Sequence, residues 1–451
     1  RPGVSGNNMK ITFIKPNIGR LGHSLYIDEG RMEPLQLGVL AGMTPDEFDV
    51  VLYDDRMEEI PFDEQTDLVA ITVETYTARR AYEIGAEYKK RGVPVVMGGM
   101  HATLLPEEVS EHTDTLYVGD GEFEWQALLS DFKNGKMRKL YKTTSGIPQP
   151  GTFTRRDIYK GKGYLPITLL QFGRGCRFSC NFCAIATYFD KTQYVRKIDE
   201  VLEEIDRQDR DFLFFVDDNI NSNHELAKEF YRELISMKVK WVSQTSIDIT
   251  NDLELMDLMI RSGCLGNVIG FESITRNSLK EMKKAPSFII QGDDYKPQLE
   301  ILRDYGHQTW ASFTLGHDHD TLDSIKATLD FAMENKFIFG AFNILMPYPN
   351  TPLHKKLKDE NRLLYDGKWW LHPDYRFNHA SFLPKQMTPD ELTEATFNLR
   401  SKFNSIMSIA KRALDFKTNL RTPIKFGMYI TYNPLYRKET FKKQGMYFGK
   451  E

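Results

Sequence analysis

Gly173-Arg174-Gly175-Cys176-Arg177-Phe178-Ser179-Cys180-Asn181-Phe182-Cys183 is the stretch of this sequence that reveals most about its fold and chemistry. It holds three of the four cysteines and lies shortly after an apolar run, residues 167–170. Three thiolates on one short loop can each bind one iron of a cubane cluster, which leaves the fourth iron open to another ligand. The loop therefore predicts a 4Fe–4S cluster with one exchangeable position.

Other uses of these cysteines explain the pattern less well. A structural zinc site takes four ligands, usually as two separated pairs, and a redox Cys-x-x-Cys pair leaves Cys176 unexplained. The fourth cysteine, Cys264, is distant in the sequence, and free cysteine is commonly buried, so we expect it in the core. The predicted cluster ligands are Cys176, Cys180 and Cys183.

On both sides of the cysteine loop, short apolar runs alternate with helical patterns. The candidate strands are residues 167–170, 212–216, 241–244, 268–270, 311–315 and 339–345. Between the first two, Ile198, Val201, Leu202 and Ile205 form one apolar stripe at helical spacing. Six strand–helix units are too few for an eight-stranded barrel, so residues 164–368 predict a partial (β/α)6 barrel.

The N-terminal part of the chain predicts a second α/β domain, over residues 9–140. Its candidate strands are residues 11–14, 50–53, 68–72, 95–97 and 115–118, and its candidate helices are 35–43, 78–90 and 122–132. This alternation is typical of a Rossmann-like parallel sheet with helices on both faces. Ligands bind such sheets at the carboxyl ends of their strands.

Two further segments complete the predicted organisation. Residues 141–163, with Pro148 and Pro150, are expected to be a linker. From residue 369 to residue 451 we expect a small, mostly helical C-terminal domain. Its first helix is predicted to begin at the capping box Thr388-Pro389-Asp390-Glu391 and to run toward Arg412.

Composition excludes several classes of protein. The chain has 451 residues, and its net charge of −4 gives no general attraction to nucleic acid. No apolar run is long enough to span a membrane. Four cysteines are too few for a secreted disulfide scaffold, so we expect a cytoplasmic protein.

The cysteine spacing, Cys-x3-Cys-x2-Cys after the first strand of a partial barrel with Phe182 before the third cysteine, resembles the radical S-adenosylmethionine superfamily. The resemblance implies that S-adenosylmethionine chelates the open iron through its amine and carboxylate. One electron from the reduced cluster then splits the sulfonium, and the resulting 5′-deoxyadenosyl radical abstracts hydrogen from an unactivated carbon. It also implies an external one-electron reductant of the flavodoxin or ferredoxin type.

The same resemblance suggests which side chains contact S-adenosylmethionine. Asp218 and Asn219 follow the second barrel strand and are candidates for the methionyl amine, or alternatively form a helix cap or turn. Ser246 and Asp248 are candidates for the ribose hydroxyls or the carboxylate, or are plain loop residues. Glu272, in Gly-Phe-Glu-Ser, matches the family's Gly-x-Glu, although a buried, paired carboxylate would look the same.

The N-terminal domain resembles the cobalamin-binding domain that precedes many of these enzymes, through Gly98-Gly99-Met100-His101-Ala102-Thr103 and Gly119-Asp120-Gly121-Glu122. The candidate cobalamin-binding residues are Thr72, Glu74, Thr75, Tyr76, Gly98, Gly99, His101, Gly119, Gly121 and Glu122. Strand-end glycines would let the backbone approach the corrin closely. The Asp-x-His-x-x-Gly motif is absent, so no histidine ligand is expected from residues 53–57. Tyr76 is a candidate lower-face neighbour, and His101 either contacts the nucleotide tail or is a structural hydrogen bonder.

Together the two domains imply a class B radical S-adenosylmethionine methylase. Hydrogen abstraction from an sp3 carbon would be followed by methylation from methylcobalamin, and no acid or base residue is assigned. One leftover cysteine cannot hold a second cubane, which excludes relatives that need one. A cobalamin-dependent cyclase or ring-remodelling oxidase, and a non-catalytic corrinoid sensor or carrier, remain alternatives.

The substrate is predicted less directly. No amphipathic membrane helix stands out, which favours a peptide or protein residue, for example in a methanogenesis enzyme, over a lipid. Aromatic side chains such as Trp369, Trp370 and Tyr375 either line the site or belong to the core. The basic run over residues 411–450 is expected to contact an acidic protein or to be a solvated face.

Overall fold

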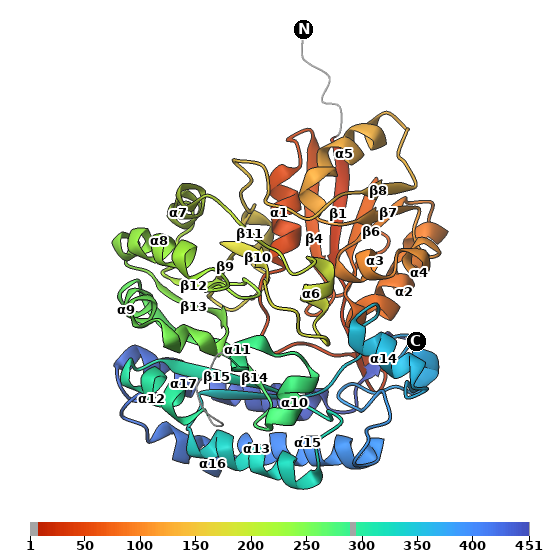
Figure 1. Cartoon of the computed structure of the whole chain (residues 1–451). Coiled ribbons are helices and arrows are strands. Elements are labelled where there is room, and N and C mark those ends of the chain that lie inside the picture. Colours follow the sequence, from red (N-terminus) through yellow and green to blue (C-terminus); the bar gives the residue numbers. More distant parts are fainter. Residues whose placement is uncertain (1–7, 289–294, 451) are drawn as a thin grey trace. The chain divides into compact units, whose positions relative to one another are not determined.

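The computed structural model describes residues 8–288 and 295–450, which form two compact units (Figure 1). The first unit contains Arg1–Leu165, Trp370–Pro373 and Met446–Glu451, and the second contains Pro166–Trp369 and Asp374–Gly445. Within the described ranges, no helix has the length and apolar character needed to cross a membrane.

The first unit is built on a six-stranded parallel sheet with the order β4-β1-β5-β6-β7-β8. Its strands are β1 (Met9–Lys15), β4 (Phe48–Asp54), β5 (Leu68–Thr72), β6 (Val95–Gly98), β7 (Thr115–Val118) and β8 (Leu140–Lys142). Its helices are α1 (Leu35–Met43), α2 (Ala78–Lys90), α3 (Met100–Leu104), α4 (Pro106–Ser110) and α5 (Trp125–Lys133). A small antiparallel sheet joins β2 (Gly19–Leu21) to β3 (Ser24–Leu25) and β17 (Tyr447–Phe448). The five predicted strands and three predicted helices are confirmed.

The segment predicted as a linker is more ordered than expected. Its first two residues belong to the sixth strand, β8, and residues 153–159 pack on α1. The Tyr159 hydroxyl donates to the Pro34 carbonyl at 3.1 Å, and the Arg155 amide donates to the Gly38 carbonyl at 2.9 Å. The prediction of a loose linker over residues 141–163 is therefore wrong for this packed stretch.

The second unit contains another six-stranded parallel sheet, with the order β16-β15-β14-β13-β12-β9. Its strands are β9 (Thr168–Leu170), β12 (Phe212–Phe215), β13 (Lys240–Thr245), β14 (Cys264–Glu272), β15 (Gln308–Leu315) and β16 (Phe339–Ile344), so all six predicted strands are confirmed. Between them lie α7 (Ile198–Asp206), α8 (His224–Leu234), α9 (Leu253–Arg261), α10 (Arg276–Glu281), α11 (Ala285–Phe288), α12 (Lys296–Asp304) and α13 (Leu322–Glu334). Curvature of this sheet into a partial barrel remains a prediction.

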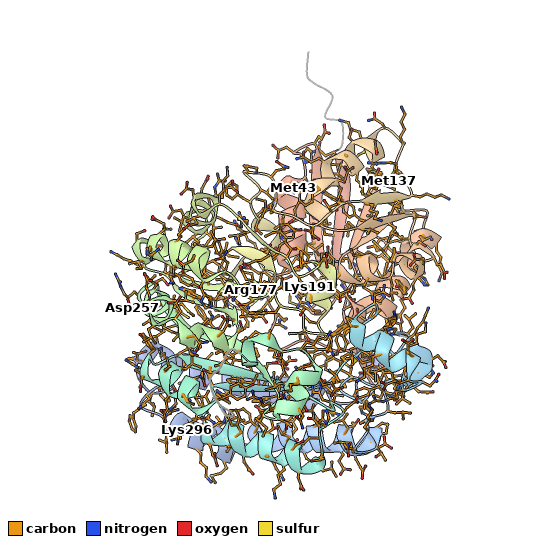
Figure 2. The ribbon with its side chains drawn as sticks, viewed as in Figure 1. Met43, Met137, Arg177, Lys191, Asp257 and Lys296 are labelled. Atoms are coloured by element: carbon orange, nitrogen blue, oxygen red, sulfur yellow. The ribbon has the colours of Figure 1, made fainter. Side chains whose placement is uncertain are left out.

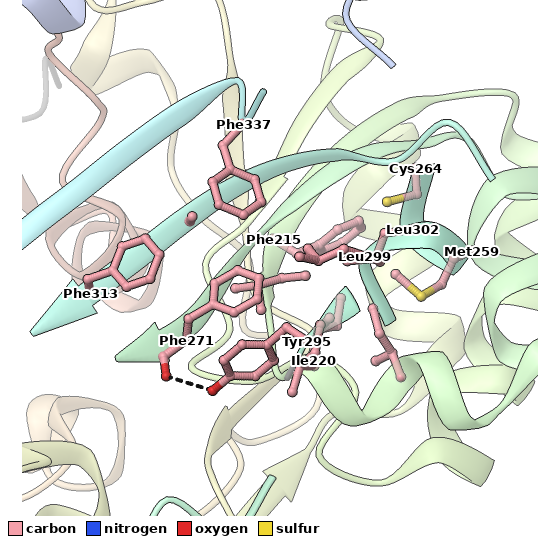
Figure 3. Close-up of a cluster of buried hydrophobic side chains, with 14 of the residues drawn as sticks. Phe215, Ile220, Met259, Cys264, Phe271, Tyr295, Leu299, Leu302, Phe313 and Phe337 are labelled. Atoms are coloured by element: carbon pink, nitrogen blue, oxygen red, sulfur yellow. Dashed lines mark hydrogen bonds between the residues drawn. The ribbon is translucent and has the colours of Figure 1, made fainter. Parts of the chain in front are cut away.

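The core of the second unit is rich in aromatic side chains. Phe271 of β14 stacks on Phe313 of β15 with ring centroids 5.7 Å apart, and the Tyr295 hydroxyl donates to the Phe271 carbonyl at 3.3 Å (Figure 3). Cys264 lies in the same cluster and is 3% exposed, which confirms its predicted place in the core. Burial raises the pKa of its thiol to about 12.

The C-terminal helices belong to the second unit and do not form a unit of their own, in contrast to the predicted separate domain. After α14 (Pro352–Asp359), helix α15 (Pro389–Phe403) begins at the predicted capping box and packs on α13 and β16. The predicted run to Arg412 is interrupted, because Ser405 caps a new helix, α16 (Ile406–Ala413). Helix α17 (Pro423–Lys443) follows.

Candidate cofactor sites

Two carboxylates that follow β12 accept hydrogen bonds from the backbone that leads into the cysteine loop. Asp217 accepts the Phe172 amide at 3.0 Å and the Gly173 amide at 2.5 Å, and Asp218 accepts the Gly175 amide at 2.7 Å. Burial raises the pKa of Asp217 to about 8 and also raises the pKa of Asp218. Asp218, predicted to bind the methionyl amine, thus already uses one oxygen to position the backbone before Cys176.

The later part of the cysteine loop is tied to α10 and to its own turn. Asn181 donates from its amide to the Met282 carbonyl at 3.1 Å and from its side chain to the Glu281 carbonyl at 2.9 Å. The Cys183 amide donates to the Cys180 carbonyl at 3.2 Å, and α6 (Ala184–Tyr188) begins directly after it. The loop is therefore fixed at both ends.

Two thiols of this loop have raised pKa values. Burial raises the pKa of Cys180, and it raises the pKa of Cys183 to about 11, so each would release a proton on binding iron. Across residues 8–288 and 295–450, no three His, Cys, Asp or Glu side chains are grouped to share one metal ion. Three ligands to three different irons need no such convergence.

Asn219, Ser246 and Asp248 come together next to the first cysteine. The Asn219 side chain donates to Ser246 Oγ at 2.9 Å and lies 3.8 Å from Cys176 Sγ. Asn219 Oδ1 and Asp248 Oδ1 are buried and accept no hydrogen bond from the described part of the chain. Because a buried acceptor without a donor is costly, these two oxygens fit a ligand that carries ammonium or hydroxyl donors. This supports S-adenosylmethionine in that position.

Asp248 is also part of a charged network that the sequence did not reveal. Arg177 of the cysteine loop, labelled in Figure 2, lies 3.4 Å from Asp248 Oδ2, and His224 Nε2 lies 3.5 Å from the same oxygen. Burial alone would raise the pKa of Asp248, but the nearby His224 and Ser246 side chains and the charge of Arg177 outweigh it and lower this pKa. The carboxylate is therefore ionised at neutral pH.

Glu272 at the end of β14 is a buried, paired carboxylate, the alternative that the sequence left open. Lys284 Nζ lies 3.0 Å from Glu272 Oε1. Burial tends to lower the pKa of Lys284, but the charge of Glu272 outweighs it and the pKa lies above its usual value. A Cβ on Gly270 would lie 2.3 Å from Glu272 Oε1, so a larger residue there would displace this carboxylate. Lys284 was missed because a lone lysine after a short helix carries no sequence signal.

Phe182, the aromatic residue before the third cysteine, packs against the core of the second unit. Its ring meets His317 edge to face with centroids 6.4 Å apart, and His317 Nε2 lies 2.9 Å from Thr314 Oγ1. Phe182 therefore connects the cysteine loop to the carboxyl end of β15.

In the first unit, several predicted cobalamin residues lie after β5. Thr72 and Thr75 are buried, and Glu74 forms an ion pair with Lys15. The Tyr76 ring packs against Phe448, with centroids 5.9 Å apart. These residues do gather at the carboxyl end of a parallel strand, where ligands bind such sheets.

Both ring nitrogens of His101 have partners within the first unit. Nδ1 lies 3.1 Å from Thr75 Oγ1 and Nε2 lies 3.1 Å from Glu108 Oε1. The same Glu108 oxygen also accepts from the Tyr82 hydroxyl at 3.0 Å and the Trp370 indole at 2.9 Å. This favours the structural alternative for His101, and it makes Trp370 a core residue of the first unit.

The strand-end glycines are needed by the protein itself. Gly99 has φ of 107°, and a Cβ there would lie 2.9 Å from the Val73 carbonyl oxygen. Gly119 has φ of 94°, and a Cβ would lie 2.4 Å from the Thr143 carbonyl oxygen. Close loop packing therefore requires glycine at both positions, and the approach of a corrin ring to them stays a prediction. The remaining candidates, Gly98, Gly121 and Glu122, lie beside them in β6 and in the turn before α5.

Residues 170–332 match the Radical SAM superfamily. Bacteriochlorophyllide d C-12(1)-methyltransferase of Chlorobaculum tepidum is 31% identical over 405 residues, covering 86% of each chain. The C-8(2)-methyltransferase of the same organism is 27% identical, covering 74% of this chain and 78% of its own.

Among solved structures, the fold resembles the cobalamin-dependent S-adenosylmethionine radical enzyme OxsB, solved with aqua-cobalamin and S-adenosylmethionine bound. The TM-score is 0.65 at 14% identity, covering 96% of this chain and 72% of OxsB. The similarity to the first methyltransferase, over most of both chains, establishes the relationship. The chain thus belongs to the radical S-adenosylmethionine superfamily, in its group of cobalamin-dependent methylases.

Proposed function

We propose that this protein is a C-methyltransferase that uses a 4Fe–4S cluster, S-adenosylmethionine and cobalamin to methylate an unactivated sp3 carbon. The observation that carries the proposal is the cysteine loop, held beside two buried oxygens, Asn219 Oδ1 and Asp248 Oδ1, that lack donors within the described chain. A loop with three cysteines leaves one iron open, and the two oxygens match the donors of a bound S-adenosylmethionine.

In this proposal the chain holds and orients its cofactors. Cys176, Cys180 and Cys183 bind three irons, and Asn219 and Asp248 accept hydrogen bonds from the methionyl amine or the ribose. When bound, the cofactors supply the radical and the methyl group, so the protein needs no general base. Electrons come from an external flavodoxin or ferredoxin type of reductant, in the cytoplasm.

Cobalamin is proposed to bind at the carboxyl edge of the first sheet, over the loop that contains Thr75 and Tyr76. The end of β4 offers no histidine, and its charged side chains are already paired. Arg56 lies 2.6 Å from Asp54, and Arg80 lies 2.8 Å from Asp55. We therefore propose that cobalt receives no histidine ligand from this strand end.

For the substrate, the relatives favour a small molecule over the peptide predicted from the sequence. The two methyltransferases compared above act on bacteriochlorophyllide d. We propose a small, largely apolar substrate, with tetrapyrroles as the first class to test. A peptide substrate stays an untested alternative.

The first experiment tests the cluster. After anaerobic reconstitution and reduction, the protein should contain about four irons and cleave S-adenosylmethionine to 5′-deoxyadenosine. The Cys180→Ala variant should lose both properties, while the matched Cys264→Ala variant, altered in the core, should keep them. Equal 5′-deoxyadenosine yields from the two variants would contradict the proposed ligands.

The second experiment separates the alternatives by following the methyl group. With methyl-deuterated S-adenosylmethionine and a tetrapyrrole mixture, a methylase gives a product heavier by one labelled methyl group. A cyclase or ring-remodelling oxidase gives an unlabelled product together with 5′-deoxyadenosine. A corrinoid sensor or carrier gives no 5′-deoxyadenosine at all.

A further inference from the structure

Helix α16 of the second unit buries two polar side chains and exposes two large apolar ones. Ser408 and Arg412 are 3% and 0% exposed, whereas Ile406 and Met407 are 73% and 66% exposed. The Arg412 guanidinium donates to the Phe337 carbonyl at 2.7 Å, which fixes this orientation. A helix that faces water alone has the opposite arrangement.

Exposed apolar side chains continue beyond α16. Leu414 and Phe416 follow it and are 64% and 79% exposed. On α17, Lys425 is buried while apolar neighbours are exposed, and the two helices are joined where the Tyr429 hydroxyl donates to the Ile409 carbonyl at 2.6 Å. We call the exposed apolar side chains of this segment the C-terminal apolar surface: Ile406, Met407, Leu414, Phe416, Ile424, Phe426 and Ile430.

So many exposed apolar side chains in one short segment are unusual for the surface of a soluble protein. Singly exposed apolar residues are common on soluble proteins, but seven of them within residues 406–430 indicate a contact surface. Elsewhere in the described chain, Leu253 and Leu322 are exposed apolar side chains that lie far from this segment in sequence, whereas Phe441, 39% exposed, lies on α17 itself.

The net charge around the C-terminal apolar surface indicates which kind of partner binds it. Residues 402–443 contain ten Lys and Arg but two Asp and Glu, a net charge of +8, whereas the whole chain carries −4. Of the two acids, Asp415 is buried and pairs with Arg303 at 2.8 Å. The exposed basic side chains are Lys402, Lys411, Lys417, Arg421, Lys438 and Lys442. Apolar side chains surrounded by basic ones are the pattern of helices that lie on anionic membranes.

We propose that the C-terminal apolar surface binds the surface of an anionic lipid bilayer without crossing it. The rest of the chain carries a net charge of −12, so an anionic surface would repel it and favour contact through this segment. The absence of an evident amphipathic helix in the sequence is explained by the division of this surface over α16, the turn after it, and α17.

Two other partners fit less well. A second copy of the chain would bring two segments of +8 charge against each other. An acidic electron donor must approach the cysteine loop, but at the C-terminal apolar surface it would lie near the opposite end of the sheet. Arg412 binds the Ile338 carbonyl just before β16, whereas the cysteine loop lies at the carboxyl ends of the strands. The eight residues of β15 alone span about 25 Å between these ends.

The test uses the full-length protein and sedimentation with vesicles. Vesicles of 30% phosphatidylglycerol in phosphatidylcholine should bind the protein at 50 mM NaCl, and binding should fall at 500 mM NaCl or with phosphatidylcholine alone. The double variant Met407→Asp/Phe416→Asp should bind at least tenfold more weakly. The control variant Leu253→Asp/Leu322→Asp changes apolar side chains elsewhere that are 56% and 45% exposed, and it should bind within twofold of the wild type.

Several results would overturn the proposal. One is that the wild type does not bind anionic vesicles. Another is that the two double variants lose vesicle binding to the same extent. A third is a dimer in solution that Met407→Asp/Phe416→Asp dissociates while neither form binds vesicles, because this would assign the surface to a second copy. Unchanged melting temperatures confirm that the variants fold. Vesicle binding needs no cofactor, so its failure would leave the proposed methyltransferase function untouched.

Discussion

His307, just before β15, is buried in an uncharged form. Its Nε2 lies 2.8 Å from Asn267 Oδ1 and its Nδ1 lies 3.2 Å from Thr309 Oγ1. Burial, together with the charge of Lys425, lowers the pKa of His307 to about 3, from an ordinary value of 6.5. The unfolded chain therefore binds a proton that the folded chain does not, and stability falls as the pH drops from about 6.5 toward 3.

We predict that His307→Gln removes this part of the pH dependence. Between pH 7 and pH 5 the wild type should lose about 2 kcal/mol more unfolding free energy than the variant. Urea unfolding at both pH values measures the difference. Parallel pH profiles of the two proteins would mean that His307 becomes charged in the folded state.

At the scale of elements, α1 shows how glycines position a neighbouring segment. A Cβ on Gly42 would lie 2.0 Å from the Phe153 carbonyl oxygen, and one on Gly38 would lie 1.9 Å from the Tyr159 hydroxyl. We predict that Gly42→Ala costs about 1–3 kcal/mol of stability and increases proteolysis within residues 153–159, because this segment must move away. Gly30→Ala, where a Cβ meets nothing within 4 Å, is the control and should change neither stability nor cleavage pattern. Equal effects of the two substitutions would refute the packing argument.

The strands of both sheets were predictable because buried parallel strands are continuous apolar runs. Strand β8 was not, since it has three residues and its Leu140 is 47% exposed. The three cysteines could be predicted as cluster ligands from their spacing alone. Arg177 and Asp248 are 71 positions apart and Lys284 and Glu272 are 12 apart, and neither separation is a recognised spacing, so only the fold shows these pairs.

For the whole molecule, the division into two compact units predicts that the two kinds of cofactor can be lost separately. The cysteine ligands lie in the second unit, and the proposed cobalamin residues lie in the first. Mutations in separate units with no shared partners act additively. The triple variant Cys176→Ala/Cys180→Ala/Cys183→Ala should therefore contain no cluster iron but bind hydroxocobalamin with unchanged affinity.

Gly99→Ala in the first unit tests the opposite case, in which cobalamin binding is weakened and the cluster is kept. With φ of 107° and a Cβ 2.9 Å from the Val73 oxygen, alanine should distort the loop after β6, costing about 1–3 kcal/mol, and weaken cobalamin binding. Its iron content after reconstitution should equal that of the wild type, because no cluster ligand lies in that unit. Visible spectra of the bound corrinoid and iron analysis measure both quantities on the same sample. Simultaneous loss of iron and cobalamin in either variant would show that the two units depend on each other for cofactor binding.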